Sequence, residues 1–459
     1  MQKVFVGWLA VVVVLYALAQ ASLDRPDATG VVRMSWATDP NPARAVQASL
    51  FSEMYPGREV FVDPGLGGDQ TKLIVQCATG VGPDIVDVYS QQQLSNLVQS
   101  GILLDLTPHA ERMGFAPRHT YPSVEDALKV EGRQYCFPAN VWANCVIYNR
   151  AIFDDHGVPY PEDGWTYEQF VSTAKRIRDA PSRSGQSHLA VAHWMNTWVV
   201  QDLLMGHGGR MFTDDGLRSA LDEPPALATM RLYHRLMHVD RVLPTPAEAA
   251  SLSSQGGWGS GGINWFSTGK AAMIFIGRWY IVQAKNYPGL ADDLGAVRLP
   301  RIGDRASQGI IGTRSAAINA QSPHAHEVLN FLQYLATPEY SGLIVADGDA
   351  LPPNPARART GADLVNKIVG DPSFHQPFIE AVTHGRALDV SPYINGALVE
   401  RWLRERIEQV ENGLIGPDEA MRQLATEINA RIRRNLERQP DLQRKAGRTI
   451  VSPSPAPRG

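Results

Sequence analysis

The stretch between Glu131 and Phe170 constrains the fold of this chain more than any other feature. Two apolar, strand-like runs in it are interrupted by a polar and aromatic segment at residues 140–144, which neither a buried strand nor a plain turn requires. A helix with a well-marked start follows, because Thr166 and Gln169 have the spacing of a capping box. The order is therefore strand, crossing, strand and helix, and we expect the crossing residues to do more than fill a core.

Strand-like and helix-like stretches alternate on either side of this segment. We expect strands at residues 30–36, 59–63, 82–88, 294–299 and 309–318, and helices at 71–78, 94–99 and 323–336. A further helix begins at Asn41-Pro42 and is expected to bury Val46, Leu50 and Met54. Two amphipathic helices near the C-terminus have apolar faces made of Val399, Trp402, Leu403, Ile407 and Val410, and of Met421, Leu424, Ala425, Ile428 and Ile432. This alternation predicts an α/β fold with a parallel sheet.

Length and charge limit the possible classes of protein. A chain of 459 residues is too long for one ordinary core and indicates two or three domains of roughly 150 residues each. The 43 basic and 47 acidic residues give a net charge of -4. Nucleic-acid-binding proteins usually show a basic excess, so we expect no nucleic-acid partner.

The N-terminus has the pattern of an export signal. Lys3 precedes an apolar run from Val4 to Ala19, and small residues suited to cleavage follow it. Residues 1–21 are therefore predicted to be a signal peptide, with an uncleaved N-terminal anchor as the alternative, and the protein is expected to be extracytoplasmic or periplasmic. At the other end, the Pro-rich residues 449–459 are predicted to be a disordered tail.

No motif for metal binding or catalysis is present. The spacing of Cys77, Cys136 and Cys145 does not suit a zinc site. Either Cys136 pairs with Cys145, as an exported protein would allow, or all three are small buried side chains. Ser260 lacks the glycine spacing of a nucleophile elbow, and His326-Glu327 lacks the second histidine of a zincin. We assign no catalytic residue, no metal and no cofactor.

Five stretches, taken in order, resemble one known family. They are Gly82–Ile85 with Gln99–Leu103, Gly132–Pro138 with Ile147–Asn149, Gly164–Thr166 with Phe170, Phe266–Trp279, and the helix from Pro323 with Phe331, Leu332 and Leu335. In this order and spacing they resemble the extracellular solute-binding proteins, family 1, of ABC importers (maltose/multiple-sugar-binding type). The resemblance covers residues 30–434, nearly all of the mature chain.

The resemblance implies an α/β, two-lobed periplasmic-binding-protein fold (type II) with discontinuous lobes and a hinge. The first lobe would take residues 30–140 plus 307–350. The second would take 144–300 plus 352–440. The ligand would lie in the cleft between them, and the lobes would close around it.

The candidate site residues combine flat rings with side-chain amides. An indole offers a rigid apolar surface to the C–H face of a pyranose, and amides pair with its hydroxyl groups. The candidates are Trp36, Asp39, Tyr89, Gln92, Asn140, Trp142, Asn144, Trp194, Trp198, Trp279, Tyr393 and Asn395. Trp165 is expected to be a structural residue beside its helix cap, and Trp402 a core residue. Maltose-binding relatives have a carboxylate in the region of Gln92, so the glutamine argues against maltose itself.

Because amides bind neutral hydroxyls and do not exchange protons near pH 7, the candidate site favours recognition without reaction. The resemblance implies a monomer that captures a carbohydrate, a mono- to oligosaccharide, and delivers it to the transmembrane subunits of an ABC permease. Two alternatives remain. One is a secreted carbohydrate-active enzyme. The other is a binder of a polyol or glycerol phosphate, for which Arg278 and Arg314 are the arginine candidates in the cleft.

Overall fold

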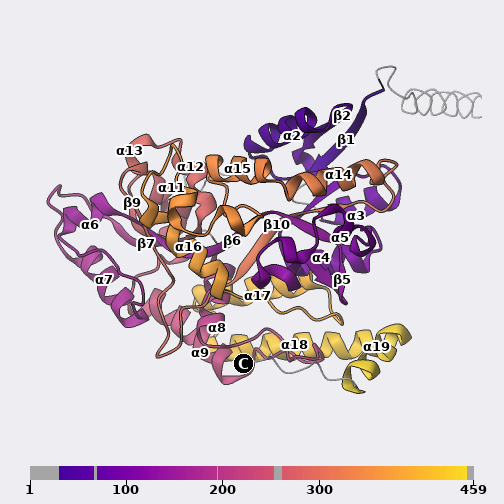
Figure 1. The fold of residues 1–459 in the computed structure, drawn as a ribbon. Helices are drawn as coiled ribbons and strands as arrows, with labels where there is room; N and C mark the ends of the chain where they lie inside the picture. Colours follow the sequence, from indigo (N-terminus) through magenta and orange to yellow (C-terminus); the bar gives the residue numbers. More distant parts are fainter. Residues whose placement is uncertain (1–29, 67–69, 194, 253–260, 452–459) are drawn as a thin grey trace, which may run out of the picture.

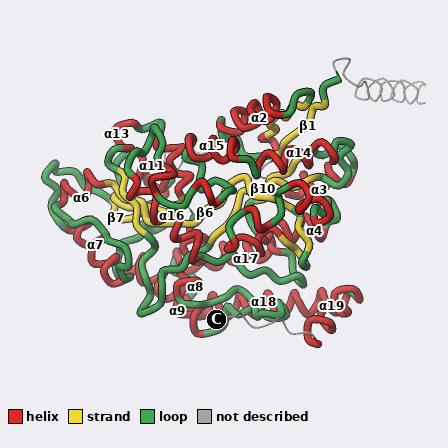
Figure 2. Tube along the Cα trace, in the orientation of Figure 1, coloured by secondary structure: helices red, strands yellow, loops and turns green. Residues whose placement is uncertain are grey.

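The computed structural model describes residues 30–66, 70–193, 195–252 and 261–451, and these fold around one long mixed sheet. Its strands are β1 (Val32–Ala37), β2 (Arg58–Asp63), β3 (Ile85–Val88), β6 (Cys136–Asn149), β7 (Leu189–His193), β8 (Ala271–Gly277), β9 (Leu294–Val297) and β10 (Ile311–Ile318). The order is β2-β1-β3-β10-β6-β8-β7, and β9 pairs with β6. A small hairpin, β4 (Lys129–Val130) with β5 (Arg133–Gln134), stands apart from it. Figure 2 shows the strands running through the middle of the molecule with helices around them.

The two apolar runs expected to be separate strands form the single strand β6, which corrects the sequence prediction. The first half of β6 pairs with β10, as in Asn140 with Arg314, and the second half pairs with β8, as in Asn144 with Gly277. Successive side chains of a strand point to opposite faces. The even-numbered residues 140, 142 and 144 therefore share one face of β6, while Val141, Ala143 and Cys145 pack into a core on the other.

Strand directions confirm the parallel sheet only in part. Strand β1 runs parallel to β2 and β3, and β7 runs parallel to β8. Strand β10 is antiparallel to both β3 and β6, and β6 is antiparallel to β8 and β9. The sheet is therefore mixed, and β6 and β10 lie in its middle and join its two ends.

Helices surround the sheet on both sides (Figure 1). In chain order they are α2 (Ala43–Met54), α3 (Gln70–Ala78), α4 (Gln91–Gln99), α5 (Thr107–Met113), α6 (Arg150–His156), α7 (Tyr167–Asp179), α8 (Asn196–Gly206), α9 (Pro224–His234), α10 (Pro246–Leu252), α11 (Gly262–Ser267), α12 (Ile281–Ala284), α13 (Pro288–Ala291), α14 (Ala325–Leu335), α15 (Pro338–Asp347), α16 (Pro372–His384), α17 (Gly396–Glu411), α18 (Pro417–Arg438) and α19 (Pro440–Val451). The long helices α18 and α19 run along the lower edge of Figure 1.

Several helices confirm the sequence prediction. The capping box of Thr166 and Gln169 starts α7, which buries Phe170. The apolar faces predicted for α17 and α18 are both buried. Trp165 donates a hydrogen bond from Nε1 to the carbonyl oxygen of Arg298 at 2.9 Å, and Trp402 lies in the core. Both tryptophans are therefore structural, as expected.

Helix α2 corrects the prediction about its buried face. Val46 is 50% exposed, whereas the side chains of Arg44, Gln47 and Phe51 are buried. Leu50 and Met54 are only partly buried. The reason is tertiary, since charged partners on other elements bind the arginine and the glutamine, as described below.

The predictions for the two chain ends and for the cysteines remain to be set against the structure. The predicted signal or anchor segment, residues 1–21, lies outside the described residues, as do 452–459 of the predicted tail. Residues 449–451, also assigned to the tail, belong to helix α19. None of the helices in the described ranges combines the length and apolar character that crossing a membrane requires. Cys77, Cys136 and Cys145 are all buried and free, so Cys136 and Cys145 do not pair.

Candidate ligand-binding site

Two adjoining cavities open beside the central strands and share Tyr89, Trp142 and Trp198. The larger, of about 170 Å³, is also lined by Asp39, Asn41, Arg44, Asn140, Trp279, Arg314 and Asp349. The smaller, of about 50 Å³, is also lined by Ser90, Gln91, Gln92, Gln201, Thr313 and Glu400, among others. These residues come from β6 and β10 in the middle of the sheet, from segments that follow β1, β3 and β8, and from helices such as α8 and α17. The lining therefore joins the first and the last parts of the chain.

The tryptophan rings that line the cavities stack on one another or pack against glycine residues. Trp142 and Trp198 stack with their ring centroids 4.5 Å apart and their planes within 8° of parallel. A Cβ atom at Gly312 would lie 2.4 Å from Trp142, and one at Gly277 would lie 2.6 Å from Trp279. Real Cβ contacts are never so short, so both indoles occupy space that only a glycine leaves open.

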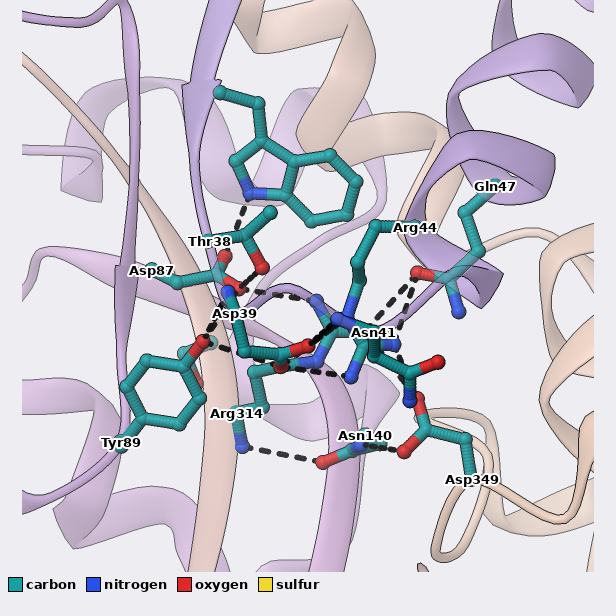
Figure 3. Close-up of polar contacts among 12 residues, drawn as sticks. Thr38, Asp39, Asn41, Arg44, Gln47, Asp87, Tyr89, Asn140, Arg314 and Asp349 are labelled. Atoms are coloured by element: carbon teal, nitrogen blue, oxygen red, sulfur yellow. Dashed lines mark hydrogen bonds and ion pairs between the residues drawn. The ribbon is translucent and has the colours of Figure 1, made fainter. Parts of the chain in front are cut away.

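Five charged residues form a buried cluster on one side of the larger cavity: Asp39, Arg44, Asp87, Arg314 and Asp349, called the charge cluster below (Figure 3). Arg44 Nη1 lies 2.5 Å from Asp349 Oδ2, and its Nη2 lies 2.9 Å from Asp39 Oδ2. Arg314 Nη1 lies 3.1 Å from Asp87 Oδ2. Arg44, Asp87, Arg314 and Asp349 are almost wholly buried, while Asp39 is partly exposed.

The pKa shifts of the two buried aspartates have opposite directions. Burial alone would raise the pKa of Asp349, but Arg44 and Arg314 outweigh it and lower that pKa below its ordinary value. Burial raises the pKa of Asp87, although Arg314 opposes the shift. Both guanidinium groups already have carboxylate partners. The cluster therefore offers no spare positive charge to an anionic ligand.

The polar residues after strands β1 and β3 meet, as expected for the carboxyl ends of neighbouring parallel strands. The Asp39 backbone N–H donates to Tyr89 Oη at 2.9 Å, and both side chains line the larger cavity. Gln92, in α4, lines the smaller cavity. Asn140 donates from Nδ2 to Asp349 Oδ1 at 3.1 Å and also lines the larger one.

Trp36 was predicted to be a ligand-binding residue, and this prediction is wrong because Trp36 lies in the core and lines neither cavity. It is fully buried, and its Nε1 donates to Asp87 Oδ1 at 2.8 Å. The guanidinium carbon of Arg314 lies 5.5 Å from the centroid of its ring. Trp36 therefore packs against the charge cluster on the side away from the cavity and contacts two of its members.

Asn144, Tyr393 and Asn395 also lie away from the lining. Asn144 donates to Asp202 Oδ2 at 2.9 Å, and Tyr393 is 1% exposed in a core. Asn395 caps α17 and donates from Nδ2 to Asn96 Oδ1 at 2.5 Å, which links α17 to α4. Trp194 lies outside the described residues. Arg278, a candidate for a phosphate ligand, is instead buried against the carbonyl oxygens of residues 350 and 364.

Sequence reasoning missed Arg44, Asp349, Gln201 and Glu400. Arg44 lies on a helix whose other residues suggested a different buried face, and Asp349 follows α15 in a loop with no motif. Gln201 lies on α8, for which no apolar face was predicted, and Glu400 lies on α17, of which only the apolar face was predicted. The Oε1 atom of Gln201 is buried and has no hydrogen-bond partner among the described residues. A polar ligand in the smaller cavity would supply one.

Asp202, in α8, joins the two central strands at the point where they pass the cavities. Its Oδ2 accepts the hydrogen bond from Asn144 of β6, and its Oδ1 accepts one from the backbone N–H of Ile310 at 2.8 Å, just before β10. Burial raises its pKa from 3.8 to about 7, although both hydrogen bonds oppose the shift. The folded protein therefore binds a proton here far more readily than the unfolded chain does.

We expect the Asp202→Asn variant to remove a specific pH dependence of stability. Because the pKa is raised by folding, the stability that Asp202 contributes is fully present below its ordinary pKa and is lost as the pH rises through about 7. Between pH 5 and pH 8 the wild type should lose on the order of 2 to 4 kcal/mol of unfolding free energy relative to the variant. Urea unfolding of both proteins at the two pH values measures the difference.

The variant is a close structural match. Asn144 Oδ1 is buried without a partner among the described residues, so a rotated Asn144 amide can accept a hydrogen bond from an asparagine at 202. All other titrating groups are shared by the two proteins and cancel in the comparison. Equal pH dependence in both would show that Asp202 titrates at its ordinary value.

Comparison with protein-family models matches residues 36–341 to the family described as bacterial extracellular solute-binding protein. Among curated proteins, the chain is 23% identical over 289 residues to the diacetylchitobiose binding protein DasA of Streptomyces coelicolor, covering 62% of this chain and 64% of that protein. It is 22% identical to an arabinooligosaccharide-binding protein of Halalkalibacterium halodurans, covering 66% of this chain and 62% of that protein. The chain thus spans slightly less than two-thirds of these relatives.

Solved structures show the same fold over most of the chain. The substrate-binding protein Lmo0181 of Listeria monocytogenes, in complex with cycloalternan, matches with a TM-score of 0.72 and 20% identity, covering 87% of this chain and 98% of that one. Maltose-bound MalE3 of T. maritima matches with a TM-score of 0.69 and 16% identity, covering 87% and 99%. At these identities the likeness concerns the fold. It confirms the two-lobed α/β architecture expected from the sequence.

Proposed function

The chain belongs to the bacterial extracellular solute-binding proteins, whose family model matches more than half of it, and from this we propose that it captures a carbohydrate for an ABC importer. The ligand is a mono- to oligosaccharide bound in the two adjoining cavities and then delivered to the transmembrane subunits of a permease. The diacetylchitobiose- and arabinooligosaccharide-binding relatives support this ligand class.

One observation carries the proposal: three indoles and a phenol line a cavity whose charges are already paired. Trp142, Trp198, Trp279 and Tyr89 supply flat apolar surfaces with few rotatable bonds, which suits the C–H faces of sugar rings. Asn140, Gln92 and Gln201 supply amides for the hydroxyl rim. Rings and amides along the two adjoining cavities suit a neutral, polyhydroxylated ligand.

The lining also supports capture by closure of two lobes. We propose the lobes as residues 30–140 plus 307–350 and 144–300 plus 352–440, joined through β6 and β10. Two core clusters draw mainly on residues 34–137 and 316–344, and a third lies wholly within 146–446. A fourth mixes Tyr121, Val124, Ala127 and Ile311 of the first lobe with residues of the second, so two short segments of the first lobe pack against the second. Helix α4 of the first lobe and α17 of the second already meet beside the smaller cavity, through the hydrogen bond from Asn395 to Asn96.

The family name places its members outside the cytoplasm, and we propose the same for this chain, exported by the segment at residues 1–21 and active as a monomer. A non-enzymatic role fits the lining. Asp39 and Asp349 are both held by Arg44, which leaves Glu400 without a free second carboxylate among the described lining residues. Hydrolysis of a glycosidic bond ordinarily needs two carboxylates that are free to act.

The alternative of a glycerol phosphate ligand has less support. Arg278 is buried away from the cavities, and Arg314 is occupied by Asp87 and by Asp349. A phosphate would have to compete with two buried carboxylates for that guanidinium group, which argues for a neutral ligand instead.

The proposal is tested by screening the protein against a panel of mono- and oligosaccharides by thermal shift. Hits are then measured by isothermal titration calorimetry, with glycerol and glycerol phosphate as comparison ligands. We expect at least one saccharide to bind with an affinity of about micromolar, roughly -8 kcal/mol, and to be recovered intact after incubation. Recovery of cleaved saccharide would favour the enzyme, and a shift with glycerol phosphate alone would contradict the carbohydrate assignment.

A further inference from the structure

A second group of functional side chains lies outside the two cavities, on the part of the chain around α6. It consists of Asp155 and His156, near the end of α6, and His188, just before β7. One potential ligand atom from each lies within 4.8 Å of the other two, and all three residues are partly buried. None of the three lines either cavity. The group has no place in carbohydrate capture.

The two imidazoles face each other with a fixed orientation. His156 Nε2 lies 2.9 Å from His188 Nδ1, and His156 Nδ1 lies 2.9 Å from the carbonyl oxygen of Ala180. Because a carbonyl oxygen only accepts hydrogen bonds, the hydrogen of a neutral His156 is on Nδ1. Its Nε2 lone pair therefore points at His188. An imidazole that donates its other N–H to a carbonyl is the usual arrangement of a metal ligand.

The distance between the two nitrogens is close to what a metal ion requires. Two nitrogen ligands on a tetrahedral zinc ion are about 3.3 Å apart, given bonds of roughly 2.0 to 2.1 Å. The two rings need to separate by only a few tenths of an ångström from 2.9 Å to admit an ion. In the absence of metal, the same two nitrogens are joined by a hydrogen bond.

The carboxylate of Asp155 is held in position by the loop that follows α7. Ser184 donates to it twice, from its backbone N–H at 2.8 Å and from Oγ at 2.7 Å. These hydrogen bonds lower the pKa of Asp155, and burial together with His156 lowers that of His188. Each carboxylate oxygen keeps a lone pair for a further partner. The set therefore combines one carboxylate and two imidazoles, which bind metal through their deprotonated oxygen and nitrogen atoms.

We propose that Asp155, His156 and His188 form a binding site for a divalent transition-metal ion of the Zn²⁺ type. Two imidazoles and one carboxylate suit Zn²⁺, Co²⁺, Ni²⁺ or Cu²⁺, with water in the remaining position. They do not suit Ca²⁺ or Mg²⁺, which prefer oxygen ligands. The ion would tie the end of α6 to the segment entering β7, and its effect would be on the stability of this region.

The test uses untagged, chelator-treated full-length mature protein, titrated with Zn²⁺ in a calorimeter and with Co²⁺ in a spectrophotometer. We expect one equivalent of Zn²⁺ to bind, and Co²⁺ to give the visible absorption of a tetrahedral or five-coordinate site. His188→Gln and Asp155→Asn should each weaken Zn²⁺ binding by about tenfold or more. His384→Gln, at an exposed histidine elsewhere on the surface, is the matched control and should bind as the wild type does.

Three results would overturn the proposal. They are no Zn²⁺ binding by the wild type, equal binding by the His188→Gln variant, and a Co²⁺ spectrum that shows only octahedral oxygen ligation. The cobalt spectrum needs only the wild type, so it decides the matter even if a variant fails to fold. The Trp142→Ala variant should bind Zn²⁺ normally, which separates this site from the carbohydrate site.

Discussion

Replacing Arg314 with methionine is expected to lower the free energy of unfolding by about 3 to 5 kcal/mol. Arg314 is 2% exposed and its guanidinium group lies between Asp87 and Asp349. Methionine fills a similar volume but leaves Asp87 buried without its ion-pair partner. Breaking a buried pair in this way is costly because the remaining carboxylate loses its bonded guanidinium partner while it stays buried. Urea unfolding at neutral pH measures the change.

A surface arginine provides the matched control. Arg401 pairs with Glu405 one helical turn away, and both side chains are about half exposed. The Arg401→Met variant should change stability by less than about 1 kcal/mol. Adding Asp87→Asn to Arg314→Met should restore part of the loss, because the uncompensated charge is then removed. Equal effects of Arg314→Met and Arg401→Met would mean that the charge cluster does not stabilise the fold.

Trp142→Ala and Trp279→Ala are each expected to weaken saccharide binding by about 1 to 3 kcal/mol, roughly 5- to 150-fold in affinity, without unfolding the protein. Both rings line the larger cavity and are only partly buried, so their removal costs contact area with the ligand more than core packing. Trp142→Phe keeps a flat ring and should lose less. Calorimetric titration with the saccharide found in the panel gives the affinities.

Trp402→Phe is the control for these variants. Trp402 is on the buried face of α17 and lines neither cavity, so its replacement should leave the affinity unchanged while reducing stability. Wild-type affinity in both Trp142→Ala and Trp279→Ala would remove the assignment of the cavity as the carbohydrate site.

Local patterns predicted the parts of the fold that local interactions determine. The capping box of α7 and the apolar faces of α17 and α18 depend on residues three or four positions apart, and these were found as expected. Asp39 and Tyr89, both candidate site residues, meet because neighbouring parallel strands end at the same edge of a sheet. Each of these predictions needed only one element or two neighbouring strands.

Long-range charge pairing could not be predicted in the same way. Arg44 and Asp349 are 305 positions apart in the chain, and no local pattern connects them. Their pairing turns α2 so that Arg44 faces inward and Val46 faces solvent, against the apolar periodicity. The same cluster draws Trp36 into the core, because Asp87 accepts its indole N–H.

In strand β6, the residues that had seemed to interrupt two strands keep the alternation of side chains that is typical of one continuous strand. Polar Asn140 and Asn144 alternate with apolar residues, so the crossing remains extended and pairs along its length with β10 and then β8. Helix α8 decides which even-numbered residues of β6 line the cavity. Its Asp202 accepts a hydrogen bond from Asn144, and its Trp198 stacks on Trp142. That choice was not visible in the sequence.

A crystal structure of the protein with the bound saccharide tests the central claim most directly. The account predicts a sugar ring lying flat on at least one of Trp142, Trp198 and Trp279, with hydroxyl groups bonded to side chains contributed by both lobes. A saccharide bound at the outer surface, with these three indoles out of contact with it, would contradict the account.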